Sequence, residues 1–476
     1  MINILPVPKE ITTEGEVGSC KLQICSSVVG FHKRIEGLKK IAQQVYDREL
    51  VNGDGGIVVY KDSDLATDAY AIETQNGHIN VFASSEEGLG YAFATIFQIA
   101  SLKGKDLHYP ICKIFDKPDC NYRGLMVDVS RQHHDIEELL AYVNICFLYK
   151  IKYLHIHFID DQAYTLPSRV LDNISSTDHY TFEEIEKLVN FAKERNVELV
   201  PEIETIGHCI CFLDKYPEIF DLKPIEGKSY DDFSINGVAK RNNVVCAGSS
   251  QVRDYMKRFI DEIIEMFPYS EYIHIGGDEA SILALDTCSV CVDYMKEKGL
   301  KSSNELFGEY LGFLANHVID RGKKPMVWEG FSKEIAHFIP KETLVIAWES
   351  YYNYCYDLIA DGFNIINCTW KPLYITTYYW WGIKEIKDWN IYSWRHWWKE
   401  SKAYGKGIDI PETDKVLGGQ LCSWECRYEQ EYDNIKRNLI VVSNNTWNKS
   451  NNKISYSGKL QKLNGLIKKL NKSYER

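Results

Sequence analysis

From about residue 120 onward, short apolar runs alternate with longer segments of helical periodicity, and this alternation constrains the fold more than any other feature of the chain. Eight such units in roughly 330 residues favour a (β/α)8 TIM barrel over an open sheet, and functional side chains then lie at the carboxyl ends of the strands. The helix-like segments are 136–148, 182–195, 252–266, 304–321 and 431–444. The predicted strands are Gly124–Val129, Tyr153–Phe158, Glu198–Ile203, Tyr272–Ile275, Pro325–Trp328, Leu344–Trp348, Asn364–Cys368 and Val416–Trp424.

The first 118 residues have a different pattern, typical of a small α+β domain. Tyr70–Thr74 and His78–Phe82 alternate like strands, and the Asn76-Gly77 pair between them predicts a hairpin. A helix is predicted over 84–102, with acidic residues in its first turn. We therefore expect an N-terminal α+β domain at 1–118, the barrel at 119–447, and a C-terminal tail with a helix at 448–476.

Composition narrows the classes of partner. The formal net charge of −12 argues against nucleic acid or an anionic membrane surface as the main partner. No apolar run approaches the ~20 residues needed to span a bilayer. The first residues lack a basic segment followed by an apolar one, so no signal peptide is predicted and a cytoplasmic location is expected. The sequence indicates no oligomeric state.

The cysteines are expected to be free thiols. Fourteen are scattered along the chain without the regular framework of a small disulfide-rich domain. Cys288 and Cys291 form a CxxC pair, but no second CxxC and no histidine pair lies nearby in the sequence. A zinc site at this pair is therefore the less favoured interpretation, and no metal is expected.

Residues 271–280 read Glu-Tyr-Ile-His-Ile-Gly-Gly-Asp-Glu-Ala and carry the strongest chemical signal. A short strand breaks at Gly276-Gly277, which allows a sharp turn and a close approach of another group. Asp278 and Glu279 follow at once. Because adjacent carboxylates repel each other, a fold that places them together must stabilise an unusual protonation state. An acidic surface loop could have the same composition, but other predicted strand ends also carry polar residues.

Three further segments end predicted strands with such residues. They read Arg-Gly-Leu-Met-Val-Asp-Val-Ser-Arg up to Arg131, Leu-His-Ile-His-Phe-Ile-Asp-Asp up to Asp161, and Pro-Glu-Ile-Glu-Thr-Ile-Gly-His up to His208. Together with the Asp278-Glu279 segment, and in this order, they resemble glycoside hydrolase family 20, the β-N-acetylhexosaminidases. The resemblance covers residues 1 to about 447.

The resemblance implies a retaining hydrolase that removes terminal non-reducing β-linked GlcNAc or GalNAc from oligosaccharides or glycoconjugates, without a cofactor. Most retaining glycosidases attack with a second carboxylate, whereas in this family the 2-acetamido oxygen of the substrate attacks. By the same resemblance, Glu279 is the general acid and base, and Asp278 holds the acetamido N–H. We expect a pocket of low dielectric to keep Glu279 protonated, while hydrogen bonds keep Asp278 ionised.

The resemblance also assigns supporting positions. Asp160 and His208 would form a hydrogen-bonded chain toward Glu279, and Tyr374 would hydrogen-bond the attacking acetamido oxygen. The residues expected to bind the sugar are Arg131, His157, Trp328, Trp348, Trp424 and Glu425. Three positions depart from the family pattern: Gln132 stands where histidine is usual, Glu204 stands where aspartate is usual, and Glu425 lies one residue earlier than the usual glutamate. The last departure bears on the choice between GlcNAc and GalNAc.

Two rival functions remain. A metal-dependent amidohydrolase would use His155 and His157, which point to one face of a strand. The later histidines fit this poorly, because His317 falls in a helix and His337 and His396 fall in helical or loop stretches. A non-catalytic sugar-binding protein is the other rival, but the full set of reactive residues gives it no support.

Overall fold

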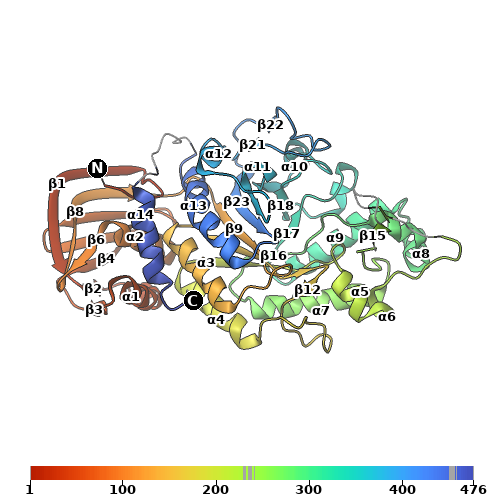
Figure 1. Cartoon of the computed structure of the whole chain (residues 1–476), viewed down its shortest axis with the longest axis horizontal. Helices are drawn as coiled ribbons and strands as arrows, with labels where there is room; N and C mark the ends of the chain where they lie inside the picture. Colours follow the sequence, from red (N-terminus) through yellow and green to blue (C-terminus); the bar gives the residue numbers. More distant parts are fainter. Residues whose placement is uncertain are drawn as a thin grey trace.

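Eight parallel strands close into a barrel in the computed structural model, which describes residues 2–228, 232–233, 239–240, 242–449, 456 and 458–474 (Figure 1). The predicted TIM barrel is confirmed, and every strand lies within two residues of its predicted bounds. The last strand returns to the first, so no edge is left open. In the order of pairing the strands are β9 (Tyr122–Asp128), β10 (Tyr153–His157), β13 (Glu198–Glu202), β16 (Tyr272–His274), β17 (Lys324–Trp328), β18 (Leu344–Ala347), β19 (Asn364–Asn367) and β23 (Val416–Trp424).

The long helices follow the strands as expected, and local sequence explains where they begin. The helix α4 begins after Thr181, whose hydroxyl accepts from the Glu184 backbone while the Glu184 carboxylate accepts from the Thr181 backbone. The helix predicted over 431–444 is longer at both ends than expected. The long helices of the barrel are α3 (Ile136–Leu148), α4 (Phe182–Glu194), α7 (Ser250–Met266), α9 (Ser303–Asp320) and α13 (Tyr428–Trp447).

Shorter elements fill the loops above the barrel. They are β11 (Ile159–Asp160), β12 (Ala163–Tyr164), α5 (Ile210–Lys215), α6 (Pro217–Phe220), β14 (Asp232–Phe233), β15 (Ala239–Lys240), η2 (Ile282–Thr287), α8 (Ser289–Lys298), η3 (Lys333–Phe338), α10 (Cys355–Ala360), α11 (Trp370–Leu373), β20 (Tyr374–Thr376), α12 (Ile383–Lys387), β21 (Ser393–Trp394) and β22 (Ile408–Asp409). Among the described residues, no helix is both long and apolar enough to cross a membrane.

The N-terminal sheet has the order β1-β8-β5-β6-β4-β2-β3, with β7 paired to β8. The predicted hairpin is present, and Gly77 turns it with φ 96°. The long edge pair β1 and β8 was not predicted, because most of β1 is exposed and carries no apolar alternation. The elements are β1 (Glu10–Lys21), β2 (Gln23–Ser26), η1 (Val29–Phe31), α1 (His32–Tyr46), β3 (Val51–Asn52), β4 (Ile57–Lys61), β5 (Tyr70–Gln75), β6 (His78–Ala83), α2 (Glu86–Ile99), β7 (Ser101–Lys103) and β8 (Asp106–Asp116).

The predicted C-terminal helix is α14 (Lys459–Leu470), which packs against α1 and α2 of the N-terminal domain and against α3 of the barrel (Figure 1). It buries Leu463, Leu466 and Leu470 at helical spacing. At its end the Asn471 side chain bonds the buried amide of Asn144 in α3. The chain terminus therefore packs against both domains. The part of the predicted tail at 450–455 lies outside the described residues.

A buried ion pair also joins the two domains. The Lys150 ammonium of the barrel donates to Asp116 Oδ2 at 2.9 Å and to the Tyr70 hydroxyl at 2.6 Å in the N-terminal sheet. Asp116 Oδ1 accepts from the Trp447 indole at 2.7 Å. Lys150 and Asp116 are completely buried. Because a charge in such a place is stable only with its partners intact, this cluster fixes how the sheet sits on the barrel.

We expect Lys150→Met to lower the free energy of unfolding by about 3–5 kcal/mol, because it leaves the Asp116 charge buried without its counter-ion. Chemical denaturation followed by tryptophan fluorescence measures the change. The matched control is Lys113→Met, which breaks the exposed pair with Glu73 and should cost about 1 kcal/mol or less. Equal small losses for both variants would contradict the role given to the buried pair.

Candidate active site

A cavity of about 260 Å³ opens at the carboxyl ends of the barrel strands. All eleven residues singled out in the sequence as site candidates line it, although they come from the ends of all eight barrel strands or the loops that follow them. The lining also includes three residues that the sequence reasoning missed. The predicted residues are Arg131, His157, Asp160, His208, Asp278, Glu279, Trp328, Trp348, Tyr374, Trp424 and Glu425, and the others are Trp370, Thr376 and Tyr378.

The two adjacent carboxylates are placed by a turn that only glycine permits. Gly276 has φ 70°, and a Cβ added there would lie 2.0 Å from the Glu204 carboxylate. Glu204, which stands where family members usually have aspartate, is completely buried beneath this turn. After the turn the Asp278 side chain points inward and is 12% exposed, whereas the Glu279 side chain is 47% exposed.

This burial is the reverse of what the sequence analysis expected. Asp278, not Glu279, is the buried carboxylate, and its Oδ1 has no hydrogen-bond partner among the described residues. Burial, opposed by His208 and reinforced by Glu279, raises the pKa of Asp278 to about 6. The reason is the geometry of the diglycine turn, which directs the first acid into the barrel and the second toward the mouth of the cavity.

A chain of alternating acids and imidazoles runs from the barrel core to Glu279. It begins where Glu202 Oε2 lies 2.5 Å from His157 Nδ1. His157 Nε2 lies 2.9 Å from Asp160 Oδ2, and Asp160 Oδ1 lies 3.3 Å from His208 Nδ1. His208 Nε2 then lies 3.4 Å from Glu279 Oε2. The position of the outermost carboxylate is thus linked to four charged or polar groups behind it.

The charges in this chain stabilise one another. Burial alone would lower the pKa of His208, but Asp160 and hydrogen bonds to Asp161 and Glu279 outweigh it and raise that pKa well above its usual value. For Asp160, burial would raise the pKa, but His208 and His157 overcome it and hold the pKa far below the usual range. His208 is therefore an imidazolium beside Glu279 at neutral pH.

Arg131 extends from the end of β9 into the cavity. One guanidinium nitrogen lies 3.1 Å from Asp128 Oδ2, and another lies 2.5 Å from Asp160 Oδ2. The guanidinium also lies over the Trp424 ring, 5.4 Å from its centroid. These contacts hold the donor fork in a single orientation, which suits recognition of hydroxyl groups.

Four aromatic rings form a closed box next to Asp278. Trp328 contacts Trp348 and Trp424, with centroids 6.2 and 5.5 Å apart. Tyr374 closes the box, because its ring is stacked on Trp348 at 6.1 Å and lies 6.2 Å from Trp424. The Trp328 indole donates to Glu202 at 2.5 Å, which ties the box to the charged chain. Such a box offers apolar faces to a small group such as a methyl.

Trp370 and Glu329 are functional candidates that the sequence reasoning missed. Trp370 stacks on the outer side of Tyr374, with centroids 5.8 Å apart. It begins the segment Trp-Lys-Pro-Leu-Tyr, which ends at Tyr374, so the signal was present in the sequence. Glu329 is buried and accepts from five consecutive backbone amides over 349–353. This arrangement orders the loop after β18, but only the fold reveals it.

A second group that sequence spacing did not reveal lies under the cavity. His274, which the amidohydrolase hypothesis left out, lies with His155 around Glu202, each ring nitrogen being 3.0 Å from a carboxylate oxygen. These three residues have the spacing of a metal site. However, the Glu202 oxygens already accept from His157 and Trp328. Protein donors therefore occupy the carboxylate that an ion would need.

Comparison with known proteins places this site in a family. The model of glycosyl hydrolase family 20, catalytic domain, matches residues 120–448. A beta-hexosaminidase of Porphyromonas gingivalis is 27% identical over 365 residues, covering 69% of this chain and 45% of that protein. A beta-hexosaminidase of Vibrio furnissii is 27% identical over 338 residues, covering 66% and 54%. The chain spans about half the length of the curated relatives it matches.

Solved structures share the fold. The exo beta-N-acetylglucosaminidase of Vibrio harveyi, in complex with N-acetylglucosamine, superposes with a TM-score of 0.82 at 21% identity, covering 98% of this chain and 77% of that one. A beta-N-acetylhexosaminidase of Streptomyces coelicolor gives a TM-score of 0.74 at 18% identity, covering 98% and 96%. The N-terminal sheet domain is therefore part of the shared architecture.

The charge on His208 gives a direct test of the electrostatics. Because its pKa is raised, the imidazolium persists as the pH rises through neutrality and is lost only well above the usual value of about 6.5. In Asp160→Asn the largest contribution that raises the pKa of His208 is lost, so that pKa should fall, because burial is then opposed mainly by Asp161 and Glu279. NMR titration of the His208 ring protons, assigned with a His208→Gln variant, measures the pKa of His208 in the wild type and in Asp160→Asn. A wild-type His208 that titrates near 6.5 would contradict the arrangement.

Proposed function

Because the chain belongs to glycosyl hydrolase family 20, whose catalytic-domain model matches residues 120–448, we propose that it is a β-N-acetylhexosaminidase. It removes terminal non-reducing β-linked GlcNAc or GalNAc from oligosaccharides or glycoconjugates. The observation that carries the proposal is the adjacent pair Asp278 and Glu279 beside a four-ring aromatic box. The names of the relatives, which are beta-hexosaminidases, support the same activity.

Glu279 acts as the general acid and base. Its side chain is the more exposed of the two carboxylates and faces the open side of the cavity, where a leaving group departs. In the first step it donates its proton to the glycosidic oxygen as the bond to the anomeric carbon breaks. In the second step it accepts a proton from the water that attacks the same carbon. His208, 3.4 Å away, orients it through both steps.

The nucleophile is the 2-acetamido oxygen of the substrate. A retaining enzyme with a protein nucleophile needs two carboxylates about 5 Å apart on opposite sides of the anomeric carbon, whereas Asp278 and Glu279 are neighbours in the chain. The acetamido oxygen bonds to the anomeric carbon as the leaving group departs, which forms an oxazolinium ring. The attacking water then opens this ring and leaves the sugar with its original configuration.

Asp278 and the aromatic box hold the acetamido group for this attack. The free Oδ1 of Asp278 accepts the acetamido N–H, and its charge stabilises the positive charge that develops on the ring nitrogen. The methyl group fills the box formed by Trp328, Trp348 and Trp424. The Tyr374 hydroxyl donates to the oxygen that attacks.

The hydroxyl groups of the sugar are held at the other side of the cavity. Arg131 presents fixed donors, and Glu425 lies beside it with φ 59°, held by a hydrogen bond from its backbone N–H to Asp128. His157 and Asp160 position Arg131 and His208 rather than touching the reacting atoms. The place of Glu425 next to Arg131 makes it the candidate for reading the 4-hydroxyl, the only group that distinguishes GlcNAc from GalNAc.

Hydrolysis of 4-nitrophenyl N-acetyl-β-glucosaminide and galactosaminide tests the proposal. Turnover of either, unchanged in a short assay by a chelator, supports the hexosaminidase and excludes the amidohydrolase. A plain 4-nitrophenyl glucoside should be almost inert, because it has no acetamido group to attack. Binding of GlcNAc without turnover would support a sugar-binding protein, and no binding at all would overturn the proposal.

Glu279→Gln should reduce hydrolysis of substrates with poor leaving groups by at least about 100-fold, because general acid catalysis is lost. Substrates with activated leaving groups require less protonation and should be affected less. The ratio of kcat/KM across a series of aryl leaving groups measures this difference. An equal loss over the whole series would show that Glu279 is not the acid.

Asp278→Asn should reduce turnover by about 10²–10³-fold for good and poor leaving groups alike, because every substrate needs the charge that stabilises the oxazolinium. In the wild type, kcat/KM should fall as the pH drops through about 6, where Asp278 gains a proton, and this limb should disappear in the variant. Azide should rescue Glu279→Ala but not Asp278→Asn. Rescue in the opposite order would mean that the two roles are exchanged.

A further inference from the structure

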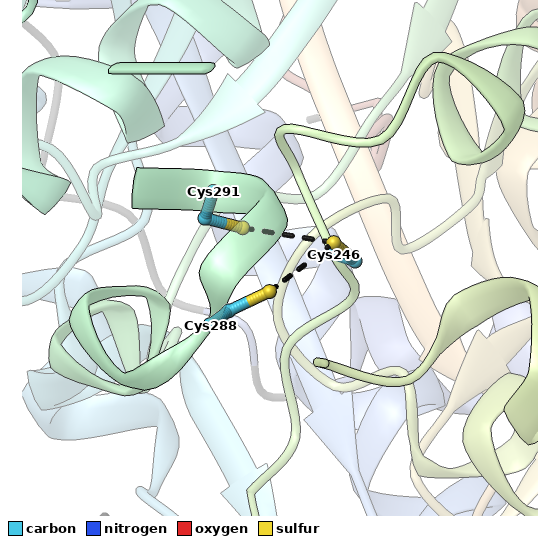
Figure 2. A group of neighbouring side chains, drawn as sticks. All are labelled: Cys246, Cys288 and Cys291. Atoms are coloured by element: carbon cyan, nitrogen blue, oxygen red, sulfur yellow. Dashed lines mark hydrogen bonds between the residues drawn. The ribbon is translucent and has the colours of Figure 1, made fainter. Parts of the chain in front are cut away.

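Cys246, which is distant in sequence, meets the Cys288 and Cys291 pair behind the loop of Glu279 (Figure 2). Cys246 Sγ lies 3.5 Å from Cys288 Sγ and 3.7 Å from Cys291 Sγ. All three side chains are buried, and none of them lines the catalytic cavity. The CxxC pair that looked isolated in the sequence therefore has a third thiol as its partner.

The local structure is built to bring these thiols together. Cys288 precedes the first residue of α8, and Cys291 lies in its first turn, so both sulfurs face the same side (Figure 2). Cys246 comes from the loop before α7. This loop packs closely on α8, because a Cβ added at Gly248 would lie 2.7 Å from the Cys291 Cα. Only glycine permits this approach.

The distances match those of a tetrahedral thiolate site. Two sulfurs bound to one Zn²⁺ at 2.3 Å with tetrahedral angles are about 3.8 Å apart. The observed separations of 3.5 and 3.7 Å from Cys246 are close to this value. A disulfide would require about 2.0 Å, so the sulfurs are arranged around a common point rather than bonded in pairs.

The surroundings of Cys288 also suit a negatively charged sulfur. The backbone N–H of Lys223 donates to Cys288 Sγ at 3.2 Å. The positive end of the α8 dipole also favours negative charge at the start of this helix. Amide donors to a cysteine sulfur are the kind of outer partner that orients metal ligands.

We propose that Cys246, Cys288 and Cys291 bind a structural Zn²⁺ ion. Binding displaces the thiol protons to solvent and leaves the fourth position for a water molecule or a further side chain. Zn²⁺ is favoured over the hard cations because all three ligands are soft sulfurs, and it needs no change of oxidation state. The site is separate from the hydrolytic site and does not depend on the function proposed for it.

The ion would stabilise the loops that carry the catalytic acid. Three residues before Cys246, the Asn243 side chain donates to the Glu279 carbonyl at 3.3 Å and accepts from the Ser281 backbone at 3.1 Å. Around Cys288, residues 223–225 pair with 287–289 through backbone hydrogen bonds. Joining Cys246 to α8 therefore fixes both sides of the segment from Glu279 to Cys288.

Metal analysis of the purified full chain tests the site directly. The protein, expressed with zinc available and kept reduced, should contain one zinc per chain, and the Co²⁺-substituted protein should show sulfur-to-cobalt charge-transfer bands and the intense visible bands of a tetrahedral ion. Protein that neither holds zinc nor acquires it from added Zn²⁺ while its thiols are reduced would overturn the proposal. A disulfide among the three cysteines, found by mass spectrometry of the alkylated, unreduced protein, would also overturn it.

Single variants locate the ion. Cys246→Ser and Cys291→Ser should each weaken Zn²⁺ binding by more than about 100-fold, since even the loss of outer partners costs 10–100-fold. The matched control is Cys146→Ser, which changes a buried thiol in α3 far from the cluster and should keep one zinc. Should a ligand variant fail to fold, the Co²⁺ spectrum of the wild type still decides. Retention of full zinc content by both folded ligand variants would place the ion elsewhere.

Zinc removal should lower the melting temperature of the protein, whereas a short activity assay with chelator should show no loss of rate. Because the cluster is buried, a chelator should remove zinc slowly, and a short assay should keep its rate. Long incubation with chelator and reductant should lower the melting temperature of the wild type, and added Zn²⁺ should restore it. The same treatment should leave the melting temperature of Cys246→Ser unchanged. A wild type whose melting temperature does not respond to zinc removal would contradict the structural role.

Discussion

The arrangement of the site depends on the buried carboxylate of Asp160. Its two oxygens contact Arg131, His157 and His208, which come from the ends of three successive barrel strands. An isolated charge at this depth would be very unfavourable, so the carboxylate is stable only while all three cations or donors remain in place. Folding of the barrel therefore also sets the positions of Arg131 and of the imidazolium beside Glu279. Such pre-set polar groups need no reorganisation when charge develops in a reaction.

Backbone strain accompanies this electrostatic order. Among the described residues, eight that are not glycine have positive φ, and three of them line the cavity: His208, Glu279 and Glu425. Left-handed conformations of such residues cost of order 1–3 kcal/mol each and persist only where neighbouring structure compels them. Here the compelling contacts are visible, since Asp128 accepts from the Glu425 backbone and Asn243 holds the Glu279 carbonyl. The packing of the closed barrel beneath the site offsets the free-energy cost of these strained conformations.

The barrel could be predicted from sequence because strands such as β10 and β18 are buried on both faces, and β18 reads as a continuous apolar run. The exposed strand β1 carried no such signal. The candidate site was predictable where a residue lies within a few positions of a strand end, as Asp278 does after β16. Contacts between segments that are far apart in the sequence could not be predicted. The contact of His274 with His155 and that of Cys246 with the CxxC pair depend on strand register and loop packing, which no local pattern encodes. The sequence also did not reveal that Asp278 is more buried than Glu279, because the geometry of the diglycine turn decides this.

Under the proposed function, the burial of Asp278 accounts for the selection of a neutral acetamido group by so polar a site. Its Oδ1 is buried and has no hydrogen-bond partner in the part of the chain that the structure describes, and its pKa is raised to about 6, chiefly by burial. A ligand that places an N–H donor on this oxygen stabilises the ionised form and lowers that pKa, so binding and ionisation reinforce each other. A sugar with a hydroxyl at the same carbon leaves the aromatic box unfilled as well. A buried charge without a partner is unfavourable. Discrimination between an N-acetyl sugar and a plain sugar therefore arises from the unpaired Oδ1 of Asp278 as much as from any contact to the ring hydroxyls.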